Sequence, residues 1–377
     1  MRWSETLKVP RRLVHRVQRD IAQSRRTVSL QHFCVIVASP RWGGAVSFGT
    51  FQPDDQPRPA HLVVERRLGA SRRSQALACA IRLTVRPMLG VYARYSWLPW
   101  PYRLVDWSAL GLRPLRGTRR HRVRLDGCPA EWLRGPGVRS GRYLLYLHGG
   151  AFVCCGLRTH RRMVSRISSA ADASVLAVEY RMLPRHPIST AVADGMHGYR
   201  WLLDHGVAGE HIVLAGDSAG GTLAFLVGLA AAEQGLPPPA GIVALSPLTD
   251  FDATVKLAHP NARRDPLFAP GVLPVINELA DRASARLLVD GAPGTPVSPV
   301  AGDLELLSPT LIQVGSTEVL LPDAELMGRR LAAAGVPCRL QVWDRQPHVF
   351  QAAADLVPEA RAAIAEIGEF VRTAAPE

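Results

Sequence analysis

The sequence predicts an α/β protein with a mostly parallel sheet covered by helices on both faces. From about residue 120 onward, short β-rich runs alternate with amphipathic or apolar helical stretches. The runs are apolar on both sides, as expected for strands buried between two helical layers. A glycine-rich turn at residues 216–221 joins one such run to a helix. The 377 residues are enough for one core of this kind with a decorating subdomain.

Seven runs are predicted to be strands. They are Val123–Leu125, Tyr143–Leu147, Val175–Val178, Ile212–Leu214, Ile242–Leu245, Leu311–Val314 and Cys338–Val342. The main helices predicted between them are Thr159–Ala171, Ala191–His205, Gly220–Gln234 and Asp323–Ala334. A Pro/Ala-rich insertion at residues 251–305, with a helical piece near Leu273–Leu288, interrupts the alternation.

An amphipathic helix is predicted upstream of the strands, over Ser74–Tyr95. Its apolar residues recur at steps of three and four. The aromatic segment Trp97–Trp107 follows, outside any strand pattern. It is expected to pack between helices, to form an apolar lid over a substrate site, or to do both.

The net charge of +13 is unevenly spread along the chain. Residues 1–142 contain 27 Lys and Arg against 8 Asp and Glu. A basic arm can bind nucleic acid or an anionic membrane. However, 43 of the 45 basic residues are arginines, which favours a genomic compositional bias, and no nucleic-acid motif accompanies the charge. We therefore expect no nucleic-acid partner. Peripheral membrane contact through the basic N-terminus and a homodimer are both compatible with the sequence.

The N-terminal segment shows neither a secretory signal nor a membrane span. Residues 1–20 are basic and lack an apolar stretch followed by a small-residue cleavage site. No run of 18 or more uninterrupted apolar residues exists, so no transmembrane helix is expected. A cytoplasmic location is the expectation. Residues 1–70 are read as a basic extension, either disordered or containing an amphipathic helix from Leu7 to Ile21.

The motif Gly216-Asp-Ser218-Ala-Gly220 marks a candidate nucleophile. It lies between an apolar strand and a helix of small residues, which is the context that a G-x-S-x-G elbow requires. The glycines allow the strand and the helix to approach each other closely. Ser218 is therefore predicted to be a catalytic nucleophile at the start of a helix.

The segment His148-Gly-Gly-Ala-Phe152 follows the predicted strand Tyr143–Leu147 and is a candidate oxyanion hole. Acyl transfer develops negative charge on a carbonyl oxygen, which fixed N–H donors stabilise. The amides of Gly149, Gly150 and Ala219 are predicted to be these donors. His148 is expected to anchor the loop rather than to act as the base.

His348 is the predicted general base, because it follows the last strand and lies after Ser218 in the chain. The acid should follow the preceding strand, where Glu318 and Asp323 are the candidates. Glu318 lies on the loop three residues past that strand and is favoured. Asp323 follows Pro322 at the start of a helix, where a carboxylate is stabilising without any catalytic role.

The six cysteines form no metal-site pattern. Cys154 and Cys155 directly follow the oxyanion loop and are expected either to pack structurally or to lie near the acyl pocket. The sequence contains no H-E-x-x-H, phosphate-binding glycine loop or EF-hand loop. Neither a metal nor a cofactor is therefore expected.

These motifs resemble the hormone-sensitive-lipase family of α/β-hydrolase esterases, particularly actinobacterial members of the LipN type. The resemblance covers residues 74–375 and includes Tyr180-Arg-Met-Leu-Pro-Arg-His-Pro187. Two departures are an alanine where many members have a third glycine after His148, and a glutamate where the acid is more often aspartate. The resemblance does not extend to the first 70 residues.

The resemblance implies a serine carboxylesterase that acts on small-molecule esters of short to medium acyl chains. It also implies a division into N-terminal cap helices (71–115), a first part of the core (116–250), a cap insertion (251–305) and a second part of the core (306–377). An amidase or deacetylase would share the same triad. A ligand-binding protein on this fold would lack the catalytic histidine, whereas His348 is present.

Overall fold

The computed structural model describes residues 62–98, 100–288 and 298–376. The chain consists of two compact units, Met1–Asp55 and Gln56–Glu377. Every described residue belongs to the second unit. The basic N-terminal segment, including the helix expected at residues 7–21, lies outside the described residues.

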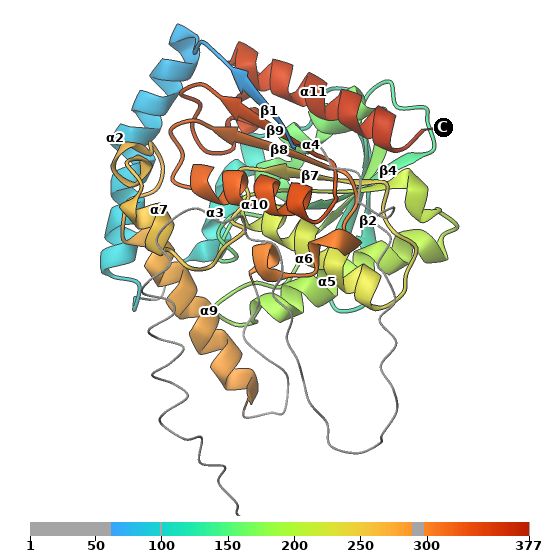
Figure 1. The fold of residues 1–377 in the computed structure, drawn as a ribbon, viewed down its shortest axis with the longest axis horizontal. Helices are drawn as coiled ribbons and strands as arrows, with labels where there is room; N and C mark the ends of the chain where they lie inside the picture. Colours follow the sequence, from blue (N-terminus) through green and yellow to red (C-terminus); the bar gives the residue numbers. More distant parts are fainter. Residues whose placement is uncertain (1–61, 99, 289–297, 377) are drawn as a thin grey trace, which may run out of the picture. The chain divides into compact units, whose positions relative to one another are not determined.

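The described residues form a nine-stranded sheet in the order β1-β9-β8-β7-β6-β4-β5-β3-β2 (Figure 1). All neighbouring strands are parallel except the pairs β2–β3 and β3–β5. The strands are β1 (Leu62–Arg67), β2 (Arg119–Arg124), β3 (Pro129–Arg134), β4 (Arg142–Leu147), β5 (Ala173–Val178), β6 (Ile212–Asp217), β7 (Gly241–Leu245), β8 (Thr310–Gly315) and β9 (Cys338–Trp343). The central strands β5, β6, β7 and β8 are buried along their whole length, as their uniformly apolar sequences predict.

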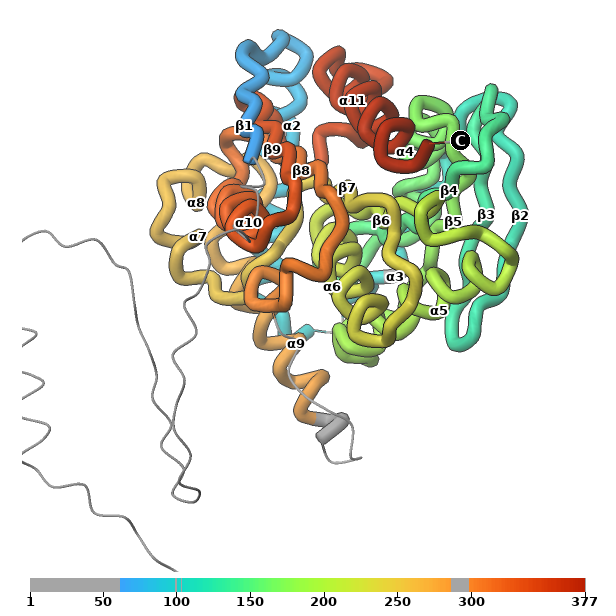
Figure 2. Tube along the Cα trace, turned by 45° about the vertical axis from the view of Figure 1, so that its right-hand side comes forward, coloured from blue at the N-terminus to red at the C-terminus, as the bar shows by residue number. Residues whose placement is uncertain are grey.

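Helices cover both faces of this sheet, as Figures 1 and 2 show. On one face, α4 (Leu157–Ala171) packs against α11 (Pro358–Ala374). On the other face, α5 (Ile188–Asp204) packs against α6 (Ala219–Glu233), and α10 (Leu321–Ala333) packs against β8 and β9. The predicted three-layer α/β architecture is confirmed.

The buried face of each helix follows from its sequence. In α4 the apolar side chains of Met163, Val164, Ile167 and Ala171 are buried, which is the spacing of a single amphipathic stripe. In contrast, α6 is apolar on all sides and is buried along most of its length. It can be packed so closely because small residues dominate its sequence.

Two strands and several helices were not anticipated. Residues 62–67, expected in the N-terminal extension, instead form β1, which pairs in parallel with β9. The extension assigned to residues 1–70 is therefore wrong for this stretch. Its charged sequence, Leu-Val-Val-Glu-Arg-Arg, suits an edge strand that is partly exposed to solvent. Strand β3 and helix α11 were likewise not identified.

The remaining helices lie around the edge where the site is found. They are α2 (Arg72–Arg94), α3 (Tyr102–Ser108), α7 (Thr254–Ala258), α8 (Asn261–Arg264) and α9 (Val272–Leu288). Helix α2 packs against α9, and the two come from the expected cap segments. The aromatic segment after α2 is divided: Trp100 and Tyr102 pack edge-on against buried Tyr92, whereas Trp97 and Trp107 are 73% and 56% exposed.

Helix α2 is also long and apolar enough to cross a membrane, by length and composition alone. Its apolar sequence is interrupted by Arg82 and Arg86, so it contains no continuous apolar run of that length. Arg82 donates a hydrogen bond to the carbonyl oxygen of Arg264 at the end of α8. Arg86 donates one to the carbonyl oxygen of Phe268, between α8 and α9. A single helix of this kind is weak evidence for a membrane span.

Candidate active site

Ser218 lies on a sharp turn between β6 and α6. Its backbone angles, φ 52° and ψ −119°, fall in a region that non-glycine residues rarely adopt. The Ser218 amide is held by a 2.7 Å hydrogen bond to the carbonyl oxygen of Leu245 in the neighbouring strand β7. The motif therefore forms the strained strand-to-helix elbow that its sequence predicts.

The two glycines around Ser218 are required by close backbone contacts. A Cβ atom on Gly216 would lie 2.2 Å from the carbonyl oxygen of Gly220. A Cβ atom on Gly220 would lie 1.9 Å from the carbonyl oxygen of Leu147, at the end of β4. The first turn of α6 is thus pressed against two strands, which only glycine permits.

Glu318 and His348 are brought together on the loops that follow β8 and β9. Glu318 Oε2 lies 2.7 Å from Nδ1 of His348. The Glu318 side chain is fully buried, and the His348 side chain is 5% exposed. Since β6, β8 and β9 are parallel, this pair and Ser218 lie at the same edge of the sheet.

The other carboxylate oxygen of Glu318 is also fixed. Glu318 Oε1 accepts hydrogen bonds from the Ser246 hydroxyl (2.8 Å) and from the Gly315 amide (2.5 Å). The Ser246 hydroxyl in turn accepts a hydrogen bond from the amide of Val349, next to His348. Ser246 therefore links the carboxylate to the histidine loop, a role that its sequence position did not reveal.

Asp323, the alternative acid, is used elsewhere. Its carboxylate forms a 2.9 Å ion pair with Lys256 and accepts hydrogen bonds from the amides of Thr249 and Asp250. Burial is the main cause that raises the pKa of Asp323 to about 6, although Lys256 opposes it. Asp323 thus anchors the loop after β7, and Glu318 is the carboxylate that contacts His348.

A second buried carboxylate, Asp265, organises the cap segment beside His348. It accepts hydrogen bonds from the amides of Leu267, Phe268 and Val319. This turn places the Phe268 ring edge-on to the His348 ring, with centroids 4.9 Å apart. The sequence offered no signal for this support beyond an Asp before a proline.

The pKa of His348 is raised above its usual value. Burial favours the neutral ring, but the hydrogen bond and the negative charge of Glu318 outweigh it. An imidazole held in this way can accept a proton and be stabilised once it is charged. The pair has the chemistry of a general base oriented by a carboxylate.

The loop after β4 differs from expectation at Gly149. The Gly149 amide was predicted to be an oxyanion donor, but it donates a 3.1 Å hydrogen bond to Asp217 Oδ1. A Cβ atom on Gly149 would lie 2.2 Å from Asp217 Oδ2. This amide therefore fixes the loop to the elbow, and the assignment of Gly149 is corrected. The amides of Gly150, Ala151 and Ala219 make no hydrogen bond within the described residues.

Asp217 belongs to a buried cluster that the sequence did not reveal. His160 Nε2 lies 3.2 Å from Asp217 Oδ2, and the Tyr146 hydroxyl donates to Asp217 Oδ1 over 2.7 Å. Burial disfavours charge on both partners. However, Asp217 raises the pKa of His160 to about 9, and His160 lowers the pKa of Asp217. An imidazolium–carboxylate pair thus lies directly beneath the glycine loop.

His148 anchors the loop, as expected, and is not placed as a base. Its Nδ1 lies 2.8 Å from the Gly149 carbonyl oxygen, and its ring stacks on Tyr180. Burial, followed by the nearby His160, lowers the pKa of His148 to about 4.

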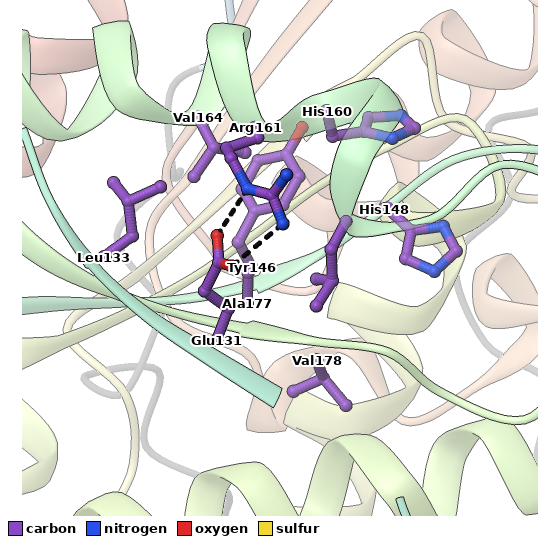
Figure 3. Close-up of a pocket in the computed structure, with 10 residues that line it drawn as sticks. Glu131, Leu133, Tyr146, His148, His160, Arg161, Val164, Ala177 and Val178 are labelled. Carbon is purple, nitrogen blue, oxygen red and sulfur yellow. Dashed lines mark hydrogen bonds and ion pairs between the residues drawn. The ribbon is translucent and has the colours of Figure 1, made fainter. Parts of the chain in front are cut away.

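Figure 3 shows His148 and His160 on the wall of a small pocket beside the Glu131–Arg161 ion pair. At about 10 Å³ this pocket is close to the space of one water molecule and cannot hold an ester.

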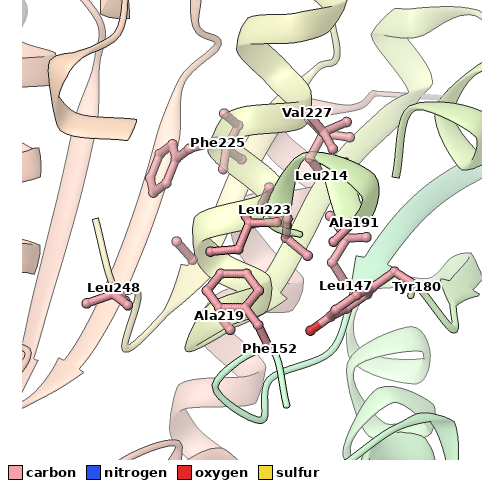
Figure 4. Packing of buried hydrophobic residues seen from close by; sticks show 14 of the residues in the cluster. Leu147, Phe152, Tyr180, Ala191, Leu214, Ala219, Leu223, Phe225, Val227 and Leu248 are labelled. Atoms are coloured by element: carbon pink, nitrogen blue, oxygen red, sulfur yellow. The ribbon is translucent and has the colours of Figure 1, made fainter. Parts of the chain in front are cut away.

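Phe152 fixes the far end of the loop in the hydrophobic core. Its side chain is buried near Ala219 and Leu223 of α6, as Figure 4 shows. Ala151 and Phe152 have φ angles of 55° and 60°, in the left-handed region. The loop is therefore held in a strained conformation by its two ends.

Residues 62–98, 100–288 and 298–376 contain no group of three or more His, Cys, Asp or Glu side chains that could hold a metal ion.

Comparison with known proteins gives the family. Residues 144–352 match a family model described as the alpha/beta hydrolase fold. The chain is 43% identical over 296 residues to Esterase LipU of Mycobacterium tuberculosis, covering 78% of this chain and 99% of that protein. It is 41% identical over 312 residues to Carboxylesterase/phospholipase LipF of the same organism, covering 81% and 83%. A crystal structure of an esterase from the bacterial hormone-sensitive lipase family is 36% identical, covers 82% of this chain and 100% of its own, and has a TM-score of 0.69. The chain therefore belongs to the hormone-sensitive-lipase family of α/β-hydrolases and is a carboxylic ester hydrolase.

Proposed function

We propose that the protein is a serine carboxylesterase with Ser218 as nucleophile, His348 as general base and Glu318 as the acid of the triad. The 2.7 Å contact between Glu318 Oε2 and His348 Nδ1 carries this proposal. Ser218 supports it from the strained elbow at the same edge of the sheet. Buried Ser246 and Gly315, which hold the second oxygen of Glu318, keep the carboxylate oriented.

The proposed reaction has two halves. His348 Nε2 takes the proton of the Ser218 hydroxyl while Oγ attacks the carbonyl carbon of the ester. The resulting tetrahedral intermediate collapses, and the leaving alcohol receives that proton from His348. His348 then deprotonates a water molecule, which attacks the acyl-enzyme and releases the carboxylic acid and Ser218. In both halves Glu318 holds Nδ1–H and stabilises the charged ring.

The proposed oxyanion hole consists of the amides of Gly150, Ala151 and Ala219. Gly149 is left out because its amide already donates to Asp217. Ala219 is the first residue of α6, so the positive end of that helix adds to its amide. Pre-positioned donors of this kind commonly contribute about 10²–10³ each to kcat.

The proposed substrates are esters of short- to medium-chain carboxylic acids. An apolar ring adjoins the proposed base: Phe268 lies edge-on to His348, with ring centroids 4.9 Å apart. Such surroundings favour an aliphatic acyl group over a charged one. The relative LipF is named a carboxylesterase/phospholipase, so a phospholipid belongs in the substrate panel.

A fluorophosphonate probe tests the mechanism, because it forms a phosphorus–oxygen bond with an activated serine and releases fluoride. We expect labelling on Ser218, found by peptide mapping, and none in Ser218→Ala. Ser108→Ala, an exposed serine on α3, is the matched control and should label normally. Kinetics with p-nitrophenyl esters from acetate to dodecanoate, a phospholipid and a matched anilide then define the substrate class. Equal labelling of Ser218→Ala would disprove the proposal, and faster turnover of the anilide would favour an amidase.

A further inference from the structure

Two adjacent cysteines, Cys154 and Cys155, lie between the oxyanion loop and α4. Their sulfur atoms are 3.9 Å apart, and both side chains are partly exposed to solvent. Two other described cysteines, Cys128 and Cys338, are buried, and Cys79 is exposed on α2 without a neighbouring thiol. The described residues thus contain one pair of thiols within reach of each other, and it adjoins the proposed reaction centre.

Cys154 is directly coupled to Gly150. The Gly150 carbonyl oxygen accepts hydrogen bonds from the amides of Val153 and Cys154, both 3.0 Å, and from the Cys154 thiol at 3.4 Å. A Cβ atom on Gly150 would lie 1.9 Å from the Cys154 carbonyl oxygen. The two segments therefore touch backbone to backbone, and neither can shift without the other.

A disulfide between adjacent residues would force such a shift. Neighbouring Cα atoms are about 3.8 Å apart across a trans peptide, whereas disulfide-bonded residues usually have Cα atoms about 4.4–6.8 Å apart. The ring is therefore strained, and closing it must bring the sulfur atoms from 3.9 Å to about 2.05 Å apart, which requires the side chains and backbone at 154–155 to move. Cys155 already has a φ of 66° in the left-handed region, so the starting backbone is strained.

We propose that Cys154 and Cys155 form a redox-sensitive dithiol site, which a hydroperoxide oxidises to a vicinal disulfide, and that this lowers esterase activity by displacing the oxyanion loop. The proposed oxidation of the two thiols rests on the 3.9 Å distance between their sulfur atoms. The effect on activity rests on the proposed function, because it requires Gly150 and Ala151 to bind the oxyanion.

The oxidation is balanced by the peroxide alone. The thiolate of one cysteine of the pair attacks one peroxide oxygen, the O–O bond breaks, and with hydrogen peroxide the products are a sulfenic acid and water. The sulfur of the other cysteine then attacks the sulfenic sulfur, the S–O bond breaks, and a second water leaves. Two thiols lose two electrons and two protons, and the peroxide gains them. The Cys154 thiol is thereby lost as a donor to the Gly150 carbonyl.

A hydrogen bond joins the two thiols, and either sulfur atom can be its donor. The hydrogen bond with Cys155 lowers the pKa of Cys154, against the effect of burial. The same hydrogen bond, together with burial, raises the pKa of Cys155. Since the thiolate is the nucleophile, whichever of the two thiols ionises reacts first, and its neighbour resolves the sulfenic acid.

Mass spectrometry tests the chemistry without reference to activity. The full chain carrying Cys34→Ser and Cys79→Ser is treated with hydrogen peroxide, alkylated and digested with trypsin. Cleavage after Arg142 and Arg158 gives one peptide that contains both cysteines. We expect this peptide to lose two hydrogen atoms and to resist alkylation until dithiothreitol is added. In Cys155→Ser and in Cys154→Ser, dimedone should trap a sulfenic acid on the remaining cysteine of the pair.

Activity is measured on the same samples with p-nitrophenyl acetate. We expect kcat to fall by roughly 10²-fold, the size of a lost oxyanion donor, and to return with dithiothreitol. The variant Cys154→Ser/Cys155→Ser should keep the basal activity and resist peroxide. A peptide that stays a dithiol at inactivating peroxide concentrations overturns the proposal, as does equal inactivation of the double variant. A disulfide that leaves kcat unchanged overturns its link to the loop, and phosphonate labelling of Ser218 separates that result from a failure of the proposed function.

Discussion

Glu318 contacts His348 through a 2.7 Å hydrogen bond, while Asp323, five residues further along, pairs with Lys256. Both carboxylates are buried and both follow β8, so sequence position alone left two acids open. In the structure the two carboxylates have different partners, His348 for Glu318 and Lys256 for Asp323. The favoured candidate contacts the histidine, and the other holds the loop after β7.

The first prediction uses these two carboxylates as matched controls. Glu318→Gln keeps the shape but offers His348 a group that cannot stabilise its charged form, so we expect kcat to fall by about 10²–10⁴-fold with little change in stability. Asp323→Asn leaves Lys256 without its buried partner, so the free energy of unfolding should drop by about 3–5 kcal/mol while kcat of the folded protein stays within a few-fold. Kinetics and urea unfolding measure both. The reverse pattern would exchange the two roles.

The second prediction concerns pH. The proposed base works as the neutral ring, and Glu318 raises the pKa of His348. Activity should therefore be lost on the acid side with a midpoint above about 6.5, the usual value for histidine. In Glu318→Gln a neutral amide replaces the charged acceptor and the negative charge is lost, so burial should move that midpoint to lower pH. Profiles of kcat/KM against pH measure both, and an unchanged midpoint in the variant would contradict this account.

The third prediction concerns the buried pair beneath the glycine loop. Replacing His160 with Leu leaves Asp217 without its charged partner, and we expect a loss of about 3–5 kcal/mol in the free energy of unfolding. Because Gly149 is bonded to the same carboxylate, kcat should fall as well. His160→Gln, which keeps a donor without the charge, should lose less of both.

The pair also has a defined pH window. The folded-state pKa of His160 is raised to about 9, so its stabilising contribution is complete below about 6.5 and is lost as pH rises through about 9. The lowered pKa of Asp217 acts in the opposite direction, since its contribution is lost in acid. The stability difference between wild type and His160→Gln, from urea unfolding, should therefore shrink between pH 7 and pH 10. A constant difference would mean that His160 is uncharged.

The sequence was sufficient for the features with short-range signatures. The positions of Ser218 at the elbow and of His348 at the same edge of the sheet could be predicted, because an elbow needs glycines at fixed offsets and His348 follows the last parallel strand. The central strands were readable because they are apolar throughout. In contrast, β1 carries charge at the sheet edge and was taken for part of an extension.

Hydrogen-bond partners across long sequence separations could not be predicted. The Gly149 amide looked free in the motif, but Asp217, 68 residues away, accepts it. Asp217 in turn is paired with His160, which stands on α4 without any motif around it. Motif spacing gives the position of a backbone group but not whether its donor is already used.

The fourth prediction tests which amides of the loop face the reaction. Gly150 has a φ of 120°, and a Cβ atom there would lie 1.9 Å from the Cys154 carbonyl oxygen, so Gly150→Ala must displace the loop. We expect kcat to fall by about 10²–10³-fold, with KM changing much less, because a donor to the transition state is lost. Gly141→Ala is the matched control: nothing lies within 4 Å of its Cβ position, so its kinetics should be those of the wild type. The phosphonate distinguishes displacement from unfolding, since a folded Gly150→Ala protein should still present Ser218 but react with the probe more slowly. If Gly150→Ala kept full activity, neither the Gly150 amide nor the loop conformation would matter for the reaction, and the oxyanion hole would have to be sought elsewhere around Ala219.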